Sequence, residues 1–70
     1  MVVTIFIKIN GKVDSKELYA KVSPFGMNVT DLIDFTLVYA DCDMRAALLV
    51  IDECSNYGDI SIDITHKKGS

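Results

Sequence analysis

Residues 27–57 read MNVTDLIDFTLVYADCDMRAALLVIDECSNY, and this stretch decides the fold. It runs for 31 residues without a glycine or proline, and most of its side chains are apolar. Its polar residues are spaced seven, four, seven and four positions apart, as along one stripe of an α-helix: Asp34, Asp41, Arg45, Asp52 and Asn56. We therefore predict that residues 29–56 are helical, as one long helix or as two consecutive helices.

A single helix of that length is difficult to fit within a small domain. About 28 helical residues are about 42 Å long, whereas a compact chain of this size is about 28 Å across. Either the chain breaks near residues 40–43, where Asp41 or Asp43 caps a second helix, or a second subunit covers the protruding turns. We favour the break, because residues 35–39 form a weak helix-forming segment. In both forms the apolar surface is wider than a small sheet covers.

The two ends of the chain predict β-strands. Residues 2–9 alternate, with branched apolar side chains on one face: Val3, Ile5, Ile7 and Ile9. We expect this face to be core, whereas Thr4 and Phe6 on the other face either form an exposed patch or are covered in a dimer. Residues 59–66 alternate as well, with Ile60, Ile62 and Ile64 facing the core.

The segment between the first strand and the long apolar stretch has two possible structures. A second strand over residues 13–23 is favoured, because the preceding Asn10-Gly11 pair is a strong hairpin signal. A short helix over residues 15–22 is the alternative, because Asp14 and Glu17 have the spacing of a helix-capping box.

Together these elements predict an α+β domain with the order β-β-α-(α)-β. A small three-stranded sheet carries one long helix or two consecutive helices on one face. Residues 1–66 form this single domain, and residues 67–70 are expected to be a frayed basic tail. The chain lacks a signal-peptide pattern and an apolar run of membrane-spanning length. We therefore expect a protein of the cytoplasm, or of a host cytoplasm, without membrane contact.

Charge and cysteine content narrow the classes of function. Seven basic residues against ten acidic ones give a net charge of −3, which disfavours direct contact with nucleic acid. If one helix carries both Cys42 and Cys54, they lie about 18 Å apart along its axis, beyond disulfide reach. We expect both cysteines to be small buried apolar residues.

No group of residues predicts a catalytic, cofactor or metal site. His66 is the only histidine, and strand alternation turns the neighbouring Asp63 and Thr65 away from it. The Asp41-Cys42-Asp43 run lacks the paired ligands of zinc sites and the glycine and glutamate of calcium loops. We therefore expect neither an enzyme nor a bound cofactor.

The excess of apolar helical surface predicts a protein-interaction module. We expect a homodimer that binds a larger cytoplasmic protein as an adaptor or inhibitor. The residues predicted for self-association follow helical spacing: Leu37, Met44, Leu48 and Ile51.

Two other functions are kept as alternatives. The first is an acidic mimic of nucleic acid that inhibits a nucleic-acid-processing enzyme, with carboxylates in place of phosphates. The residues concerned, which are also the candidates for partner binding, are Asp52, Glu53, Asp59 and Asp63. The second alternative is a small enzyme whose active site lies at a subunit interface.

Overall fold

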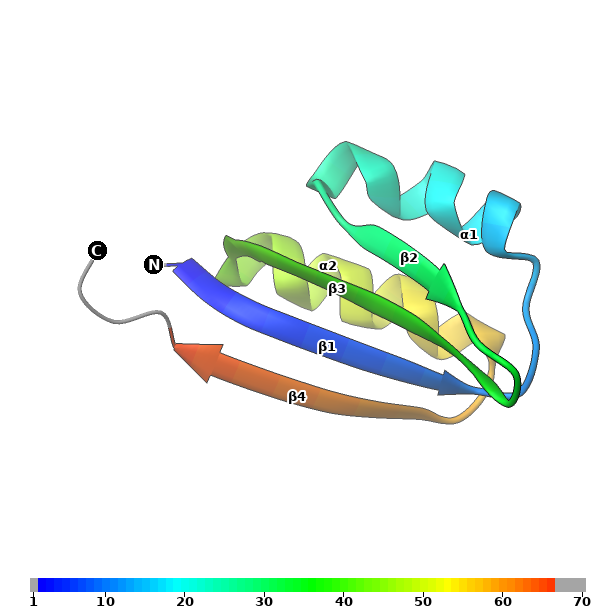
Figure 1. Ribbon diagram of the computed structural model, residues 1–70. Coiled ribbons are helices and arrows are strands. Elements are labelled where there is room, and N and C mark those ends of the chain that lie inside the picture. Colours follow the sequence, from blue (N-terminus) through cyan, green and yellow to red (C-terminus); the bar gives the residue numbers. More distant parts are fainter. Residues whose placement is uncertain (1, 67–70) are drawn as a thin grey trace.

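The computed structural model describes residues 2–66 (Figure 1). It contains four strands, two α-helices and two short 3₁₀ turns. In chain order they are β1 (Val2–Asn10), α1 (Ser15–Val22), η1 (Ser23–Phe25), β2 (Asn28–Asp31), β3 (Phe35–Asp43), α2 (Met44–Cys54), η2 (Ser55–Tyr57) and β4 (Ile60–His66).

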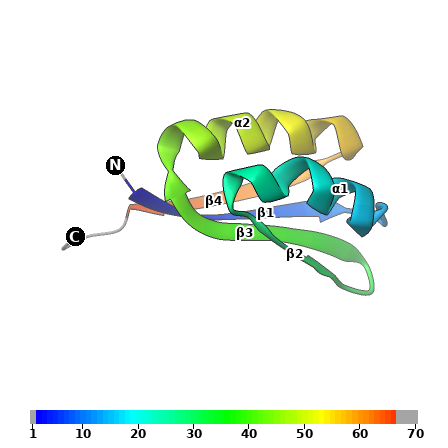
Figure 2. The ribbon, with the colours of Figure 1, turned by 90° about the horizontal axis from the view of Figure 1, so that it is seen from above.

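The four strands form one antiparallel sheet in the order β2-β3-β1-β4. Helix α1 connects β1 with β2, and β3 lies between these two strands in the sheet. Helix α2 connects β3 with β4, and β1 lies between those two strands. This β-α-β-β-α-β arrangement is the split βαβ, or ferredoxin-like, motif. Both helices cover the same face of the sheet (Figure 2). The expected α+β class is confirmed, but the sheet has four strands rather than three and a helix separates the first two.

The core lies between the helices and the sheet. Strand β1 contributes the odd-numbered side chains predicted from its alternation, and all four are fully buried: Val3, Ile5, Ile7 and Ile9. Helix α2 adds Ala47, Val50 and Cys54, whose spacing of three and four residues places them on one helical face. Helix α1 adds Leu18 and Val22 in the same way.

The prediction of a second strand over residues 13–23 is wrong, and the helical alternative is correct. The Asp14 side chain accepts hydrogen bonds from the backbone N–H groups of Lys16 and Glu17, which caps the N-terminus of α1. Gly11 does have the positive φ of +90° that an Asn-Gly turn suggests. Its N–H, however, donates to the carbonyl of Asp34 at 3.1 Å, so the chain turns towards a helix instead of a hairpin partner.

The prediction of helix over residues 29–56 is wrong for its first half. Residues 28–43 form the β2–β3 hairpin, and only α2 and η2 are helical. Four of residues 35–39 are aromatic or β-branched, which favours a strand. Strand β3 pairs with β1 along its whole length, from Phe35 opposite Asn10 to Asp43 opposite Val2. This long-range pairing outweighs the helical spacing of the polar residues. Part of that spacing spans the junction between β3 and α2.

Two details of the predicted boundaries agree with the structure. Asp43 caps α2 and accepts a hydrogen bond from the Arg45 N–H at 2.8 Å, as proposed for a break near residues 40–43. The last strand is present as β4. Its apolar face is less buried than expected, because β4 is an edge strand and Ile62 is 44% exposed. The predicted frayed tail, residues 67–70, lies outside the described residues.

Candidate interaction surface

The face of the sheet opposite the helices, which we call the open face, is covered by no element within residues 2–66 (Figure 2). The two middle strands present four apolar or aromatic side chains there, from the middle of the face to the first residue of β3, and we call them the apolar centre: Phe6, Phe35, Leu37 and Tyr39. They alternate with residues that are buried under the helices, such as Ile5, Thr36 and Val38. Part of the open face is thus apolar, whereas the uncovered face of a one-sided sheet is normally polar because it meets water.

The aromatic rings of the apolar centre make two contacts, one with each other and one with Lys8 beside them. The rings of Phe6 and Tyr39 are stacked, with centroids 6.0 Å apart and planes 15° apart. The Lys8 ammonium lies 4.5 Å from the centre of the Phe35 ring, within cation–π distance. Phe6 nevertheless remains 42% exposed and the other three side chains are half-buried, so the apolar centre is partly in contact with water.

Polar side chains surround the apolar centre on both outer strands. Strand β2 contributes Asn28 and Thr30, and the Thr30 hydroxyl lies 3.3 Å from the Tyr39 hydroxyl. Strand β4 contributes Ser61, Asp63 and Thr65, all exposed. An apolar centre within a polar rim is the usual anatomy of a protein–protein interface.

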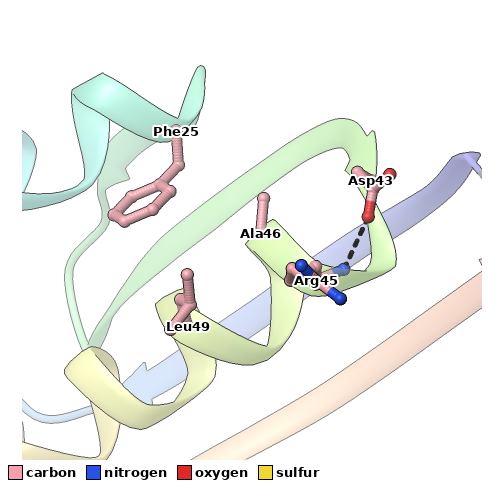
Figure 3. A pocket seen from close by; sticks show the side chains of 5 residues that line it. All are labelled: Phe25, Asp43, Arg45, Ala46 and Leu49. Atoms are coloured by element: carbon pink, nitrogen blue, oxygen red, sulfur yellow. Dashed lines mark hydrogen bonds between the residues drawn. The ribbon is translucent and has the colours of Figure 1, made fainter.

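A second exposed surface lies on the helical side. A groove of about 500 Å³ separates η1 from α2 and is lined by Phe25, Asp43, Arg45, Ala46 and Leu49 (Figure 3). Phe25 and Leu49 approach it from opposite sides, and Asp43 and Arg45 lie at one end. Leu48 and Leu49 are 57% and 53% exposed on α2.

The four residues predicted for self-association do not share one face. Leu37 belongs to β3 and to the open face, whereas Met44, Leu48 and Ile51 belong to α2 on the other side of the sheet. Met44 and Ile51 are half-buried and pack against the core, and Leu48 is exposed. The predicted spacing assumed one continuous helix, and β3 takes the place of its first half.

The four acidic residues predicted for partner binding are also separated. Asp52 is exposed on α2, and the Glu53 carboxylate lies 3.6 Å from the Lys21 ammonium of α1. Asp59 precedes β4, and Asp63 lies on the open face, across the sheet from α2. The structure therefore presents no continuous acidic surface made of these four residues.

The histidine and the cysteines do not form one cluster. His66 on β4 and Cys42 on β3 lie on either side of Val3, while Cys54 is at the end of α2. Within residues 2–66, no three His, Cys, Asp or Glu side chains gather where they could hold a metal ion. Both cysteines are free; Cys54 is buried as predicted, and Cys42 is half-buried.

Neither thiol is activated as a nucleophile. Burial raises the pKa of the Cys54 thiol to about 11, and the nearby Glu53 carboxylate adds to this shift. Partial burial, followed by the charges of Asp43 and Asp41, raises the pKa of Cys42. Both thiols are therefore protonated at neutral pH, whereas a reactive cysteine needs the thiolate.

Comparison with known proteins gives no match: no protein-family model, no curated protein and no solved structure is significantly similar to this chain. Within residues 2–66, no helix has the length and apolar character needed to cross a membrane.

Sequence reasoning found only part of the open face. It placed Phe6 and Thr4 on the second face of the first strand, and it selected Leu37. It missed Phe35 and Tyr39, which join Leu37 on β3. The available signal was that these three residues are two positions apart, as on one face of a strand. Thr36 and Val38 lie between them and point to the core, so polar and apolar residues do not alternate along this segment.

Proposed function

We propose that this chain is a non-enzymatic interaction module, which forms a homodimer through the open face and binds a larger cytoplasmic protein as an adaptor or inhibitor. The observation that carries the proposal is the apolar centre on β1 and β3, surrounded by polar side chains and uncovered within residues 2–66. Burial of this surface would contribute about 25 cal/mol for each Å² of apolar area removed from water.

The size of the open face supports a second copy as the partner. Strands of up to nine residues, spaced about 4.8 Å apart, give a face of about 450 Å² once the shorter outer strands are allowed for. Two such faces total about 900 Å² as a flat projection, and the relief of the side chains increases the accessible area. Specific protein–protein interfaces bury at least about 1,000 Å² of accessible surface, counted over both partners.

The charge of the open face favours a protein partner over nucleic acid. Aromatic residues on the middle strands of a four-stranded sheet stack bases in one class of RNA-binding domain. Here Asp63 lies beside the aromatic rings, and Lys8 is the only lysine or arginine on the four strands within residues 2–66. A phosphate backbone would meet repulsion at such a surface.

A dimer through the open face leaves the helical side free for a larger partner. The exposed Leu48 and Leu49 and the groove beside Phe25 offer apolar contacts there. A cytoplasmic location is part of the proposal, and the two free cysteines agree with a reducing compartment.

The dimer is tested by measuring mass against concentration with sedimentation equilibrium or light scattering. We expect twice the monomer mass of 7.7 kDa at micromolar concentration. Leu37→Asp buries a carboxylate in the apolar centre and should raise the dissociation constant at least about 30-fold, the effect of losing a typical interface hot spot.

Leu48→Asp is the matched control, because it makes the same chemical change on the helical side. It should leave the mass unchanged, and circular dichroism should show that both variants stay folded. A wild-type chain that is monomeric at high micromolar concentration contradicts the dimer. Dissociation by Leu48→Asp but not by Leu37→Asp would move the interface to α2, where the predicted Met44 and Ile51 also lie.

A further inference from the structure

We propose that the outer edge of β4 binds an extended segment of the larger partner, which pairs with β4 as a fifth strand of the sheet. The segment carries apolar side chains at alternate positions and a basic side chain opposite Asp63. This inference rests on the larger protein partner of the proposed function and names the part of that partner that is recognised.

The backbone of β4 has unpaired groups along its outer edge. In an antiparallel pair, residues that bond to the neighbouring strand alternate with residues whose N–H and C=O groups point away from it. The Asn10 N–H donates to the Asp59 carbonyl at 3.0 Å, which fixes this alternation for β1 and β4. Odd-numbered residues of β4 therefore bond to β1, whereas three even-numbered residues point their backbone groups outwards, where no further strand lies within residues 2–66: Ile60, Ile62 and Ile64.

Strand β4 lacks the features that normally protect the edge of a sheet. It contains no proline or lysine, and its register with β1 is continuous from Ile60 to His66, so it has no bulge. The other edge strand, β2, has only four residues and a polar residue at each end. Of the two edges, β4 is thus the one that offers a regular template to another strand.

The helices leave β4 largely uncovered on the helical side of the sheet. Helix α1 lies against β2, and α2 lies against β1 and β3, whereas β4 extends beyond α2 (Figure 1). Ile62 is 44% exposed on this side, and Ile60 and Ile64 are half-buried. Side chains directly opposite one another in paired strands lie on the same face. Apolar residues of an added strand would therefore cover these isoleucines.

Helix α2 widens the apolar surface next to β4. Glu53 marks the side of α2 that faces α1, because its carboxylate lies 3.6 Å from the Lys21 ammonium. Leu48 lies about 140° around the helix from Glu53, and it is 57% exposed. The side of α2 that faces away from α1 carries three apolar residues in all: Met44, Leu48 and Ile51. An added strand would thus meet apolar surface from both β4 and α2.

On the open face, the charge of β4 selects the segment. Asp63 is exposed at the middle of β4, between Ser61 and Thr65. In the part of the chain that the structure describes, its carboxylate forms no ion pair. Opposite charges on directly paired residues of neighbouring strands attract each other. A lysine or arginine at the paired position of the segment therefore complements Asp63.

The same charge disfavours a second copy at this edge. Strand β4 pairs with itself over its full length only when Asp63 of one copy lies opposite Asp63 of the other, because Asp63 is its middle residue. Like charges directly opposite each other destabilise a strand pair. The proposed dimer also uses the open face, and a further contact between copies would extend the assembly beyond two subunits. We therefore assign the edge to the larger partner.

A synthetic peptide, Ser-Val-Lys-Ile-Thr-Val-Ser, is the probe. When it pairs antiparallel with β4, its lysine lies opposite Asp63 and its three apolar residues lie opposite the three isoleucines. At a peptide concentration ten times the dissociation constant, hydrogen exchange of the Ile62 and Ile64 amides should slow about tenfold, because only the free fraction exchanges. The Val29 amide, which points outwards from the β2 edge, is the control and should be unchanged.

Charge exchange tests the predicted pairing at Asp63. A peptide with glutamate in place of its lysine should bind about fivefold more weakly, because a cross-strand attraction becomes a repulsion. The Asp63→Lys variant should reverse this preference. Asp52→Lys makes the same change of charge on α2 and should retain the preference for the lysine peptide.

A backbone variant tests the pairing independently of charge. Ile62→Pro removes an N–H that points outwards, so the bonds between β4 and β1 are kept. It should bind the peptide at least about fivefold more weakly, because one hydrogen bond is lost. Ile62→Val keeps the N–H and should bind as the wild type does. Circular dichroism shows whether the variants are folded, and the reversal by Asp63→Lys decides if Ile62→Pro is not.

The outcomes separate the edge from the dimer. Peptide binding that leaves the Ile62 and Ile64 amides unchanged overturns the proposal, as does a peptide that fails to bind at millimolar concentration. Protection of these amides in the chain alone, growing with protein concentration, would assign the edge to a second copy and also overturn it. Peptide-dependent protection in a chain that is monomeric by mass supports the edge and overturns only the dimer.

Discussion

Cys54 shows how one buried residue couples stability to pH. Its side chain is fully buried at the end of α2, and burial raises its pKa to about 11. The protonated thiol is therefore favoured by the fold. This contribution to stability is complete below the unfolded-state pKa near 9 and is lost as the pH rises towards 11.

We expect the free energy of unfolding of the wild type to fall by about 1 to 2 kcal/mol more than that of Cys54→Ala between pH 8 and pH 11. Urea unfolding at a series of pH values measures this difference. Cys42→Ala is the control: it removes only the contribution of the raised pKa of Cys42 and should retain the pH dependence that Cys54 causes. Identical pH profiles for the wild type and Cys54→Ala would contradict the assignment.

At the scale of the element, α1 depends on its cap. The helix has only eight residues, which is too short to be stable alone. Two supports are visible: the Asp14 carboxylate at the N-terminus, and the burial of Leu18 and Val22 against the sheet. The cap satisfies two backbone N–H groups that would otherwise lack partners within the helix.

Asp14→Ala should therefore lower the free energy of unfolding by about 1 kcal/mol, as measured by urea or thermal denaturation. Asp14→Asn keeps a side-chain oxygen at the same position and should retain most of the stability. If the two variants are equally destabilised, the negative charge rather than the capping hydrogen bond is responsible.

At the scale of the whole molecule, the uncovered open face links folding to association. Any partner that binds only the folded chain raises its stability by mass action. A tenfold increase in protein concentration adds about 0.7 kcal/mol per protomer to a dimer, which for a domain of this size raises the Tm by about 3 to 6 °C.

Thermal unfolding over a hundredfold range of concentration measures this shift. Leu37→Asp, which should be monomeric, is expected to have a Tm that does not depend on concentration. A wild-type Tm that stays constant across the range would show that the folded chain does not need its second copy for stability.

The sequence by itself determined the elements whose pattern is unambiguous. The alternation of β1 identified its core face, because one side is branched and apolar throughout. Strand β4 followed from alternation, and local capping chemistry limited the start of α2 to Asp41 or Asp43, of which Asp43 is the cap. These features depend on neighbouring residues, which sequence reasoning can compare directly.

Only the tertiary structure decided the middle of the chain. Strand β3 carries apolar side chains on both faces, because Val38, Ala40 and Cys42 lie in or against the core while Phe35, Leu37 and Tyr39 form the apolar centre. Its polarity therefore lacks the two-residue period that marks a strand, and its pairing partners in β1 lie 25 or more residues away. The same long-range pairing leaves α1, rather than a second hairpin strand, to connect β1 with β2, and it creates the open face on which the proposed function depends.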